Sequence, residues 1–464
     1  MAKNKKATRA PGKSRASRSG DYRAKVRMYR QGLGDCFLIT LPRKNGKPYY
    51  ILIDCGVILG TSDAAAKMIA VVEDIIETTK NGEKGYVDLL IATHEHWDHL
   101  SGFIQAKEAF SGLAVGEVWL AWTEDPNDDL AKRLHAEHQA LRLALASACA
   151  RLRLGQGNDS LAESMMEFFG AAGQGTTGEA LRNIKAFKPE KTRFCLPRDA
   201  AVEPDGTAAR LYVLGPPHDE KMIKKYNPSK SDPETYAVAM SKLVPALIDL
   251  DAGAPFDPIA RIPFDVAGQL RFFQDHYWGE HPDSRSERPE SAEKDQSWRR
   301  IDGDWLDISS ALALQLDSAT NNTSLVLAIE LDNGDVLLFA ADAQVGNWLS
   351  WQELSWSVGG KTVTGPDLLA RTVLYKTGHH GSHNATLREN GLELMKKLQI
   401  AFIPVDHAMA VKKRWGKMPL EKLEARLNEI TDHHVLRIDQ EVPAGMEKQV
   451  MQDKDKRLYY EVTI

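Results

Sequence analysis

The chain has 464 residues, of which 43% are hydrophobic and 27% are charged, a composition typical of a folded globular protein. No apolar run approaches the ~20 residues needed to span a bilayer, and no apolar segment follows the basic N-terminus as in a secretory signal. The four cysteines are scattered and form no CxxC pair, which disfavours a disulfide scaffold. We therefore expect a soluble cytoplasmic protein with no membrane partner.

The charge is unevenly distributed. Residues 1–20 contain seven Lys or Arg and no acid, although the net charge of the whole chain is −5. This composition predicts a disordered basic tail over residues 1–20 and an acidic folded domain over residues 21–464. The alternative for the tail is an arm that binds phosphate backbones through counterion release.

Predicted strands and helices alternate through the first part of the chain. Apolar runs predict strands in 22–42, where two strands flank a Gly-rich turn, and in 48–56, 87–93 and 117–122. Apolar residues at helical spacing, after a Ser-Asp start, predict a helix over 62–80. Strands without clean alternation are typical of sheets covered by helices. The pattern therefore predicts an α/β fold.

The remainder has two irregular stretches and a second strand-rich region. The pattern is helical over 129–170 and poor over 219–309, with short strands at 193–197 and 210–217 between them. Strands are predicted within 323–343, where Asn-Gly marks a hairpin, and within 371–376, 398–406 and 433–439, with a helix over 419–430. We interpret residues of about 126–200 as a helical insertion and 219–315 as a charged, loop-rich insertion.

Four metal-capable side chains crowd the stretch THEHWDHLSG, which follows the apolar run VDLLIA. His94, His96, Asp98 and His99 offer imidazole nitrogen and carboxylate oxygen, which suit zinc and also manganese or iron. On a turning backbone, residues i and i+2 can face one ion while the following Asp-His pair faces a neighbouring ion. Because one zinc site needs only three or four ligands, this crowding predicts two ions, with further ligands from elsewhere.

Further candidate ligands also follow predicted strands. Asp342 ends the run VLLFAAD, where its carboxylate could bridge two metals, although a lone acid at a strand end is more often a turn residue. His379 and His380 follow VLYKTG, with His383 just beyond, and paired histidines at a strand end seldom arise from packing. His218 follows LYVLGPP, where a solvated role and a ligand role are both open.

These motifs carry a resemblance to a known family. HEHWDH is similar to the HxHxDH signature of the metallo-β-lactamase superfamily, and ILIDCG and LLFAADA resemble the strands that precede the signature and end in the bridging aspartate. Within the superfamily the chain most resembles the metallo-β-lactamase domain of the DNA-uptake competence protein ComEC, through GLGDC, YKTGHHGS and the GKMP–helix–VLRID segment. The likeness covers roughly residues 24–125, 210–218 and 322–441. It implies an αββα sandwich with metals at one edge between the sheets.

The resemblance also implies roles for the candidate ligands. His94 and His96 would hold a first metal, Asp98, His99 and one histidine of HHGS would hold a second, and Asp342 would bridge. Asp54, in ILIDCG, would support the site without binding metal. His379 is the preferred HHGS ligand, which leaves His380 to face substrate, and the reverse assignment stays open. Whether His218 is a further ligand of the first metal also stays open.

The expected activity is that of a binuclear metal-dependent hydrolase with two divalent ions, zinc before manganese. The resemblance implies a phosphodiesterase or nuclease that acts on nucleic acid through a metal-bridging hydroxide, with Asp98 and His380 as catalytic residues. One alternative is a small-molecule ester, lactone or thioester hydrolase. An alternative of another class is a non-catalytic interaction module, whose insertions would contact a protein partner.

Three tryptophans in QVGNWLSWQELSW raise a separate question. Trp348, Trp351 and Trp356 have a spacing that favours packing in the core or in a partner groove. The alternative is a platform on which nucleic-acid bases stack near the active site.

Overall fold

The computed structural model describes residues 22–44, 46–154, 175–228, 266, 269–273, 276, 304–413, 415, 418–453 and 457–464. These residues form a mixed α/β fold with two large sheets and flanking helices, which confirms the predicted α/β class. The predicted basic tail at 1–20 lies outside the described residues, as do 155–170 of the predicted helical stretch and most of 229–303. None of the described helices has both the length and the apolar character that a membrane span requires.

Nine described strands form the first sheet, in the order β16-β17-β1-β2-β3-β5-β6-β7 with β4 paired to β5. Neighbours from β16 to β3 run antiparallel, whereas β3, β5, β6 and β7 run parallel. The loops that follow β3 and β5 therefore leave the same edge of this sheet. The strands are β1 Lys25–Tyr29, β2 Phe37–Leu41, β3 Tyr49–Ile53, β4 Lys80–Asn81, β5 Lys84–Ala92, β6 Leu113–Ala121, β7 Thr192–Cys195, β16 Val450–Gln452 and β17 Tyr459–Thr463.

Six described strands form the second sheet, in the order β15-β14-β13-β10-β9-β8. Strands β10, β13, β14 and β15 run parallel, so Asp342 after β10 and the histidine pair after β13 leave the same edge. Strands β8, β9 and β10 run antiparallel, and β9 and β10 form the hairpin that Asn-Gly predicts. The strands are β8 Arg210–Gly215, β9 Val326–Glu330, β10 Val336–Phe339, β13 Thr372–Lys376, β14 Ile400–Ile403 and β15 Val435–Arg437. A separate hairpin joins β11 Ser355–Val358 to β12 Lys361–Thr364.

The two sheets share one hydrophobic cluster, which contains side chains of both. The ring of Phe37 on β2 lies 5.6 Å from that of Phe339 on β10 and 6.4 Å from that of Phe402 on β14. Aromatic pairs at this separation add to the stabilisation that burial of their surface provides. The strand edges that carry the candidate ligands are held against each other by this common core.

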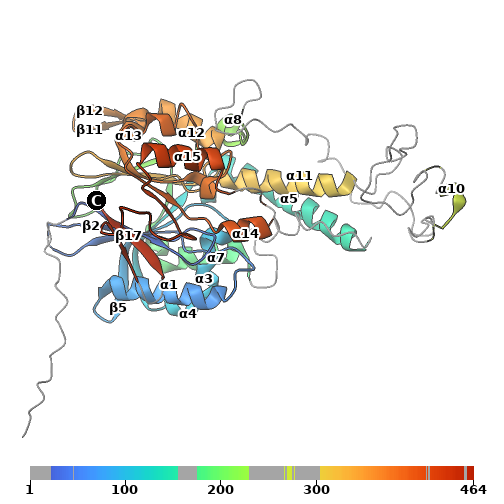
Figure 1. Ribbon diagram of the computed structural model, residues 1–464, viewed down its shortest axis with the longest axis horizontal. Helices are drawn as coiled ribbons and strands as arrows, with labels where there is room; N and C mark the ends of the chain where they lie inside the picture. The colour runs from blue at the N-terminus through green and yellow to red at the C-terminus, as the bar shows by residue number, and fades with distance from the viewer. Residues whose placement is uncertain are drawn as a thin grey trace, which may run out of the picture.

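Helices cover the opposite face of each sheet (Figure 1). Helix α1 buries Met68, Val71, Val72 and Ile75 in a cluster with strands of the first sheet, as its predicted apolar stripe requires. Helices α12, α13 and α15 contribute to the cluster on the second sheet. The helices on the two sheets and around the loops are α1 Ala64–Thr78, α2 Trp97–Leu100, α3 Gly102–Gln105, α4 Lys107–Phe110, α7 Thr177–Phe187, α8 Glu220–Ile223, α10 Arg271–Phe273, α12 Val345–Ser350, α13 Gly365–Ala370, α14 His407–Lys412 and α15 Glu421–Ile430.

Two long helices from the predicted insertions pack against each other. They are α5 Asp129–Leu154 and α11 Asp304–Asn321, which project side by side from the body of the molecule in Figure 1. Helix α11 runs past the predicted boundary at residue 315, and its residues Ala313 and Leu316, on either side of that boundary, are buried in the cluster on the second sheet. The stretch 126–200 also contains β7, which extends the first sheet by pairing with β6. Parts of both predicted insertions thus belong to the body of the fold.

The three tryptophans are packing residues. Trp348 on α12 and Trp351 in the 3₁₀ turn Trp351–Glu353 are fully buried, and Trp356 on β11 is 4% exposed. The Trp348 and Trp351 rings lie 4.0 Å apart within the cluster on the second sheet. A stacking platform needs an exposed ring face, so the base-stacking alternative is wrong for these residues.

Candidate metal centre

The four donors of THEHWDHLSG lie on the loop that follows β5 and on the short helix α2. His94 is 3% exposed, and His96, Asp98 and His99 are fully buried. The residues of β5 from Val87 to Ala92 are buried because the sheet is covered on both faces, which explains the continuous apolar run before the motif. The donors therefore leave the end of a rigid, buried strand.

Two turns support this loop: the GLGDC turn between β1 and β2, and the turn that follows β3 at Cys55 and Gly56. The Asp35 amide donates to the carbonyl of Asp98 over 3.1 Å, and the Cys55 amide donates to the carbonyl of His99 over 2.8 Å. A Cβ on Gly34 would lie 2.5 Å from the Asp98 carbonyl oxygen, and one on Gly56 would lie 2.4 Å from it. Only glycine allows backbones to approach this closely, so the two turns fix the position of the motif.

Among three groups of potential ligands in the described residues, two share Asp342 and form where the two sheets meet. The nitrogen or oxygen atoms that each group offers all lie within 4.8 Å of one another. The first group is His94, His96 and Asp342, and the second is Asp98, His99, Asp342 and His380. Asp342 belongs to both groups, and each group takes donors from both sheets. The predicted convergence of distant strand ends is therefore present.

The separations within the groups suit divalent cations. His94 Nε2 lies 3.0 Å from His96 Nδ1 and 3.8 Å from Asp342 Oδ2. His99 Nε2 lies 3.2 Å from Asp342 Oδ2, and His380 Nε2 lies 3.0 Å from Asp98 Oδ2. Ligand bonds of about 2 Å in a tetrahedral zinc site put donor atoms about 3.3 Å apart. The donor set and its spacing could hold two ions that share one carboxylate.

Buried polar atoms without partners support the same interpretation. Asp98 Oδ1, His99 Nε2 and Asp342 Oδ1 have no hydrogen-bond partner among the described residues. Buried polar atoms are normally hydrogen-bonded, because desolvation without a partner costs about 1–3 kcal/mol or more for a charged group. Cations between these atoms would satisfy them, so the residues present fit a metal centre.

Partners outside the ligand groups fix which nitrogen each histidine offers. His99 Nδ1 lies 2.8 Å from Asp54 Oδ2, and His380 Nδ1 lies 2.9 Å from the Pro404 carbonyl oxygen. Each contact places the ring proton on Nδ1 and directs Nε2 at Asp342 or Asp98. Asp54 also accepts from the Thr93 amide and hydroxyl over 2.8 and 2.7 Å. Asp54 therefore contacts the candidate ligand His99, which is the position that the resemblance implies for it.

The structure brings His380, rather than the preferred His379, into the four-residue ligand group. His379 Nε2 lies 3.9 Å from Asp342 Oδ2 and 3.5 Å from Asn321 Nδ2. Both histidines adopt left-handed backbone conformations, with φ of 40° and 52°. Such conformations cost of order 1–3 kcal/mol and cluster at functional sites. The geometry therefore favours the reverse assignment, with His380 as ligand and His379 beside the centre.

Burial and neighbouring charges shift the pKa values of the groups in the site in different directions. Burial lowers the pKa of His96 to about 3 and that of His379 to about 4, which keeps both imidazoles neutral. Burial alone would raise the pKa of Asp342, but its attraction to His99 and Lys376 holds that pKa well below its ordinary value, and the same attraction raises the pKa of His99. Neutral imidazole and ionised carboxylate are the species that coordinate divalent ions.

Lys376, at the end of β13, is a site residue whose role the sequence analysis did not assign. Its Nζ lies 2.6 Å from Asp35 Oδ2 and 3.5 Å from Asp342 Oδ1, and it donates to the Ala341 carbonyl over 2.9 Å. The side chain is 1% exposed. Asp35, Asp54 and His99 form a third group of metal-capable residues, but Lys376 already pairs with Asp35. The lysine therefore neutralises this network and holds the β10 and β13 loops together.

His218 is not brought to the centre. It belongs to none of the ligand groups found among the described residues. Its Nε2 lies 2.8 Å from Asp128 Oδ2, its ring packs edge-on against Trp122, and its side chain is 43% exposed. The ligand interpretation of His218 is unsupported, because the acid at the start of α5 already holds this ring.

Replacing His218 with alanine is therefore expected to leave metal stoichiometry unchanged. The loss of this partly exposed contact with Asp128 should lower the free energy of unfolding by less than about 1 kcal/mol. Metal content of the purified variant, with His94→Ala as the control that loses metal, checks this. Fewer bound ions in His218→Ala than in the unaltered protein would contradict the placement.

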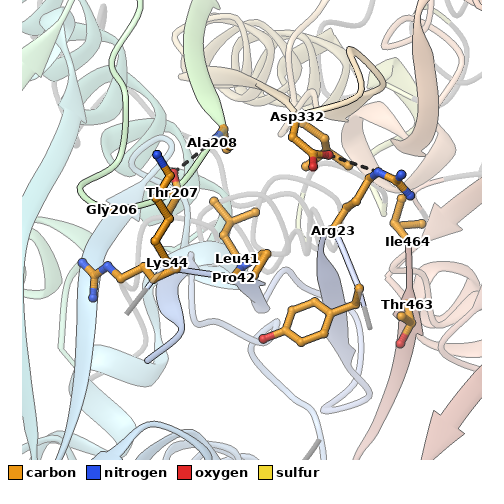
Figure 2. Close-up of a pocket in the computed structure, with 14 residues that line it drawn as sticks. Arg23, Leu41, Pro42, Lys44, Gly206, Thr207, Ala208, Asp332, Thr463 and Ile464 are labelled. Carbon is orange, nitrogen blue, oxygen red and sulfur yellow. Dashed lines mark hydrogen bonds and ion pairs between the residues drawn. The ribbon is translucent and has the colours of Figure 1, made fainter. Parts of the chain in front are cut away.

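An open pocket lies at the ends of β2, β9 and β17, away from the loops that carry the candidate ligands (Figure 2). Its volume is about 470 Å³, and its lining includes the end of β2, the end of β9 and the C-terminal residues of β17. Arg23 and Asp332 face each other there in an ion pair of 3.1 Å. None of the metal-capable groups contributes to this lining, so the pocket is separate from the candidate centre.

The chain was compared with protein-family models and with curated proteins. No protein-family model matches the chain, and no curated protein matches it. The assignment of function therefore depends on the arrangement of residues in the site.

Proposed function

We propose that this protein is a binuclear metal-dependent hydrolase. The observation that carries the proposal is the sharing of Asp342 between two ligand groups, one completed by His94 and His96 and the other by Asp98, His99 and His380. Two adjacent cations held by one bridging carboxylate are typical of enzymes that cleave phosphoester bonds. Zinc is the expected metal because imidazole nitrogen predominates, with manganese as the alternative.

The arrangement of the sheets supports a metallo-β-lactamase-like αββα sandwich. The two sheets share a core, helices cover their outer faces, and the ligand loops meet at one edge. The order of the motifs along the chain is the order expected from the resemblance. The resemblance to the ComEC domain, through GLGDC and YKTGHHGS, makes a phosphodiester of nucleic acid the proposed substrate.

Asp98 and His379 have separate roles in the proposed reaction. Divalent ions, when bound, would supply a hydroxide nucleophile at neutral pH and offset negative charge on the reacting group. Asp98 would orient the nucleophile through its second oxygen, since Oδ2 already faces His380 at 3.0 Å. His379 would contact a phosphoryl oxygen, because it lies beside Asp342 without belonging to either ligand group.

The experiment combines metal loading with a panel of substrates. Metal-free protein would be reconstituted with Zn²⁺ or Mn²⁺ and incubated with bis-p-nitrophenyl phosphate, single- and double-stranded DNA, RNA, a p-nitrophenyl ester and a lactone. We expect phosphodiester cleavage that a chelator abolishes, that added metal restores, and that His94→Ala lacks. Cleavage of the ester or lactone alone would favour the small-molecule alternative. Turnover that survives both chelation and His94→Ala would refute a metal mechanism.

A further inference from the structure

Helix α11 brings a buried acid to the first ligand group. Asp317 lies one turn before the end of this helix and is 5% exposed. Its Oδ1 lies 3.9 Å from His96 Nε2, and its Oδ2 accepts from Asn321 Nδ2 over 3.1 Å. The stretch around Asp317 is outside the motifs that carry the family resemblance. Its role must be inferred from the geometry alone.

The orientation of His96 shows which nitrogen it can offer. His96 Nδ1 lies 3.0 Å from His94 Nε2, so Nδ1 is the nitrogen that faces the other donors of the first ligand group. One imidazole can present only one nitrogen to a given ion, and the other nitrogen then carries the proton. The proton of His96 therefore belongs on Nε2, the atom that Asp317 approaches. His99 has the opposite arrangement, because Asp54 contacts its Nδ1.

Asp317 itself needs such a donor. Its Oδ1 is buried and has no hydrogen-bond partner among the described residues, although its Oδ2 is satisfied by Asn321. A buried carboxylate oxygen without a donor is costly. A contraction of the 3.9 Å separation by about 1 Å would give a hydrogen bond of ordinary length between His96 Nε2 and Asp317 Oδ1.

We propose that Asp317 is a positioning residue of the metal centre, which accepts a hydrogen bond from His96 Nε2 and thereby directs His96 Nδ1 at the first metal. The inference rests on the proposed function to the extent that it requires a metal at the His94–His96 group. Asp317 acts through His96 and touches neither ion nor substrate. Most of helix α11 falls in the predicted insertion at 219–315, and Asp317 lies just past its boundary, in the last part of the helix.

The test measures metal binding directly. Zn²⁺ would be titrated calorimetrically into metal-free protein, and Co²⁺ loading would be followed by its visible absorption spectrum, for the unaltered chain, Asp317→Asn and Asp317→Ala. We expect Asp317→Ala to bind one of its two ions 10–100-fold more weakly, the loss typical of removing a partner of a ligating histidine. Asp317→Asn should retain part of the affinity, because its amide oxygen can still accept from Nε2. Both variants should reach two ions at saturation with an unchanged Co²⁺ spectrum.

Matched variants separate this role from general damage. Asp54→Asn should also weaken one ion, and the double variant Asp54→Asn/Asp317→Asn should weaken both, because the two acids support histidines of different groups. Asp332→Asn, an exposed acid at the distant pocket, should bind as the unaltered chain does. If Asp317→Ala does not fold, as judged by circular dichroism, Asp317→Asn decides the question.

Two results would overturn the positioning role. Unchanged affinity for both ions in Asp317→Ala, or in Asp317→Asn where only that variant folds, would show that Asp317 does not act on His96. Loss of one ion even at saturation, with an altered Co²⁺ spectrum, would make Asp317 a ligand instead. Both results differ from failure of the proposed function, in which the unaltered chain itself would bind fewer than two ions.

Discussion

Replacing Asp342 with asparagine is expected to reduce the proposed phosphodiester hydrolysis by at least about 100-fold, the upper end of the loss found when a side chain that supports a metal ligand is removed. Asp342 is the one residue common to both ligand groups, and its Oδ2 lies 3.2 Å from His99 Nε2 and 3.8 Å from His94 Nε2. Asparagine has the same shape but no negative charge, so it cannot hold two cations in proximity. Metal analysis and turnover of bis-p-nitrophenyl phosphate measure the effect.

The fold of this variant should be retained. The backbone amide of Asp342 bonds to Ser324 Oγ, a contact that the substitution does not remove. Asparagine loses the attraction to His99 and Lys376 that holds the pKa of Asp342 low, so the metal-free variant should melt below the metal-free parent but still unfold cooperatively. Asp332→Asn, which changes an exposed acid, serves as the control. Two ions bound with parental affinity in Asp342→Asn would contradict the bridging role.

The second large effect concerns stability. Replacing Lys376 with methionine is expected to lower the free energy of unfolding of the metal-free protein by about 3–5 kcal/mol, the cost of leaving one member of a buried ion pair alone. Lys376 Nζ lies 2.6 Å from Asp35 Oδ2 with both side chains nearly inaccessible, and methionine preserves the length of the stem without the charge. Urea denaturation followed by tryptophan fluorescence measures the change.

An exposed lysine provides the matched control. Lys397 pairs with Asp335 at 3.1 Å, and its side chain is 54% exposed, so Lys397→Met should cost no more than about 1 kcal/mol. The double variant Asp35→Asn/Lys376→Met should be more stable than Lys376→Met, because it removes the unpaired carboxylate. Equal losses in Lys376→Met and Lys397→Met would show that the buried pair does not stabilise the fold.

Strong local patterns made much of the fold predictable. The continuous apolar runs of β3, β5 and β10 and the stripe of α1 correspond to elements that the structure contains. Strand β17 was missed, because its tyrosines and charges do not form an apolar run and its partner β1 is more than 400 residues away. Helix α11 was also missed, since a charged, irregular stretch precedes it. Its burial depends on packing against α5, which no local pattern reveals.

The candidate site was predictable where its donors are adjacent in sequence. His94, His96, Asp98 and His99 form a dense cluster, and Asp342 follows a buried strand. The sequence could not show whether His379 or His380 is the ligand. Both residues have left-handed backbone conformations, and the direction of each side chain depends on these φ and ψ angles, which the sequence does not give. Asp317 has no local signal, since a single acid on a helix is ordinarily solvated. Its burial beside His96 is a property of the folded chain.

The candidate metal centre would also affect the stability of the contact between the two sheets. In both ligand groups, some donors follow strands of one sheet and others follow strands of the other. Separating the sheets would therefore require each ion to give up part of its coordination, so ion affinity adds to the free energy that keeps the two halves of the fold together. Removing ions bound at this site would thus lower the free energy of unfolding and shorten the lifetime of the folded chain.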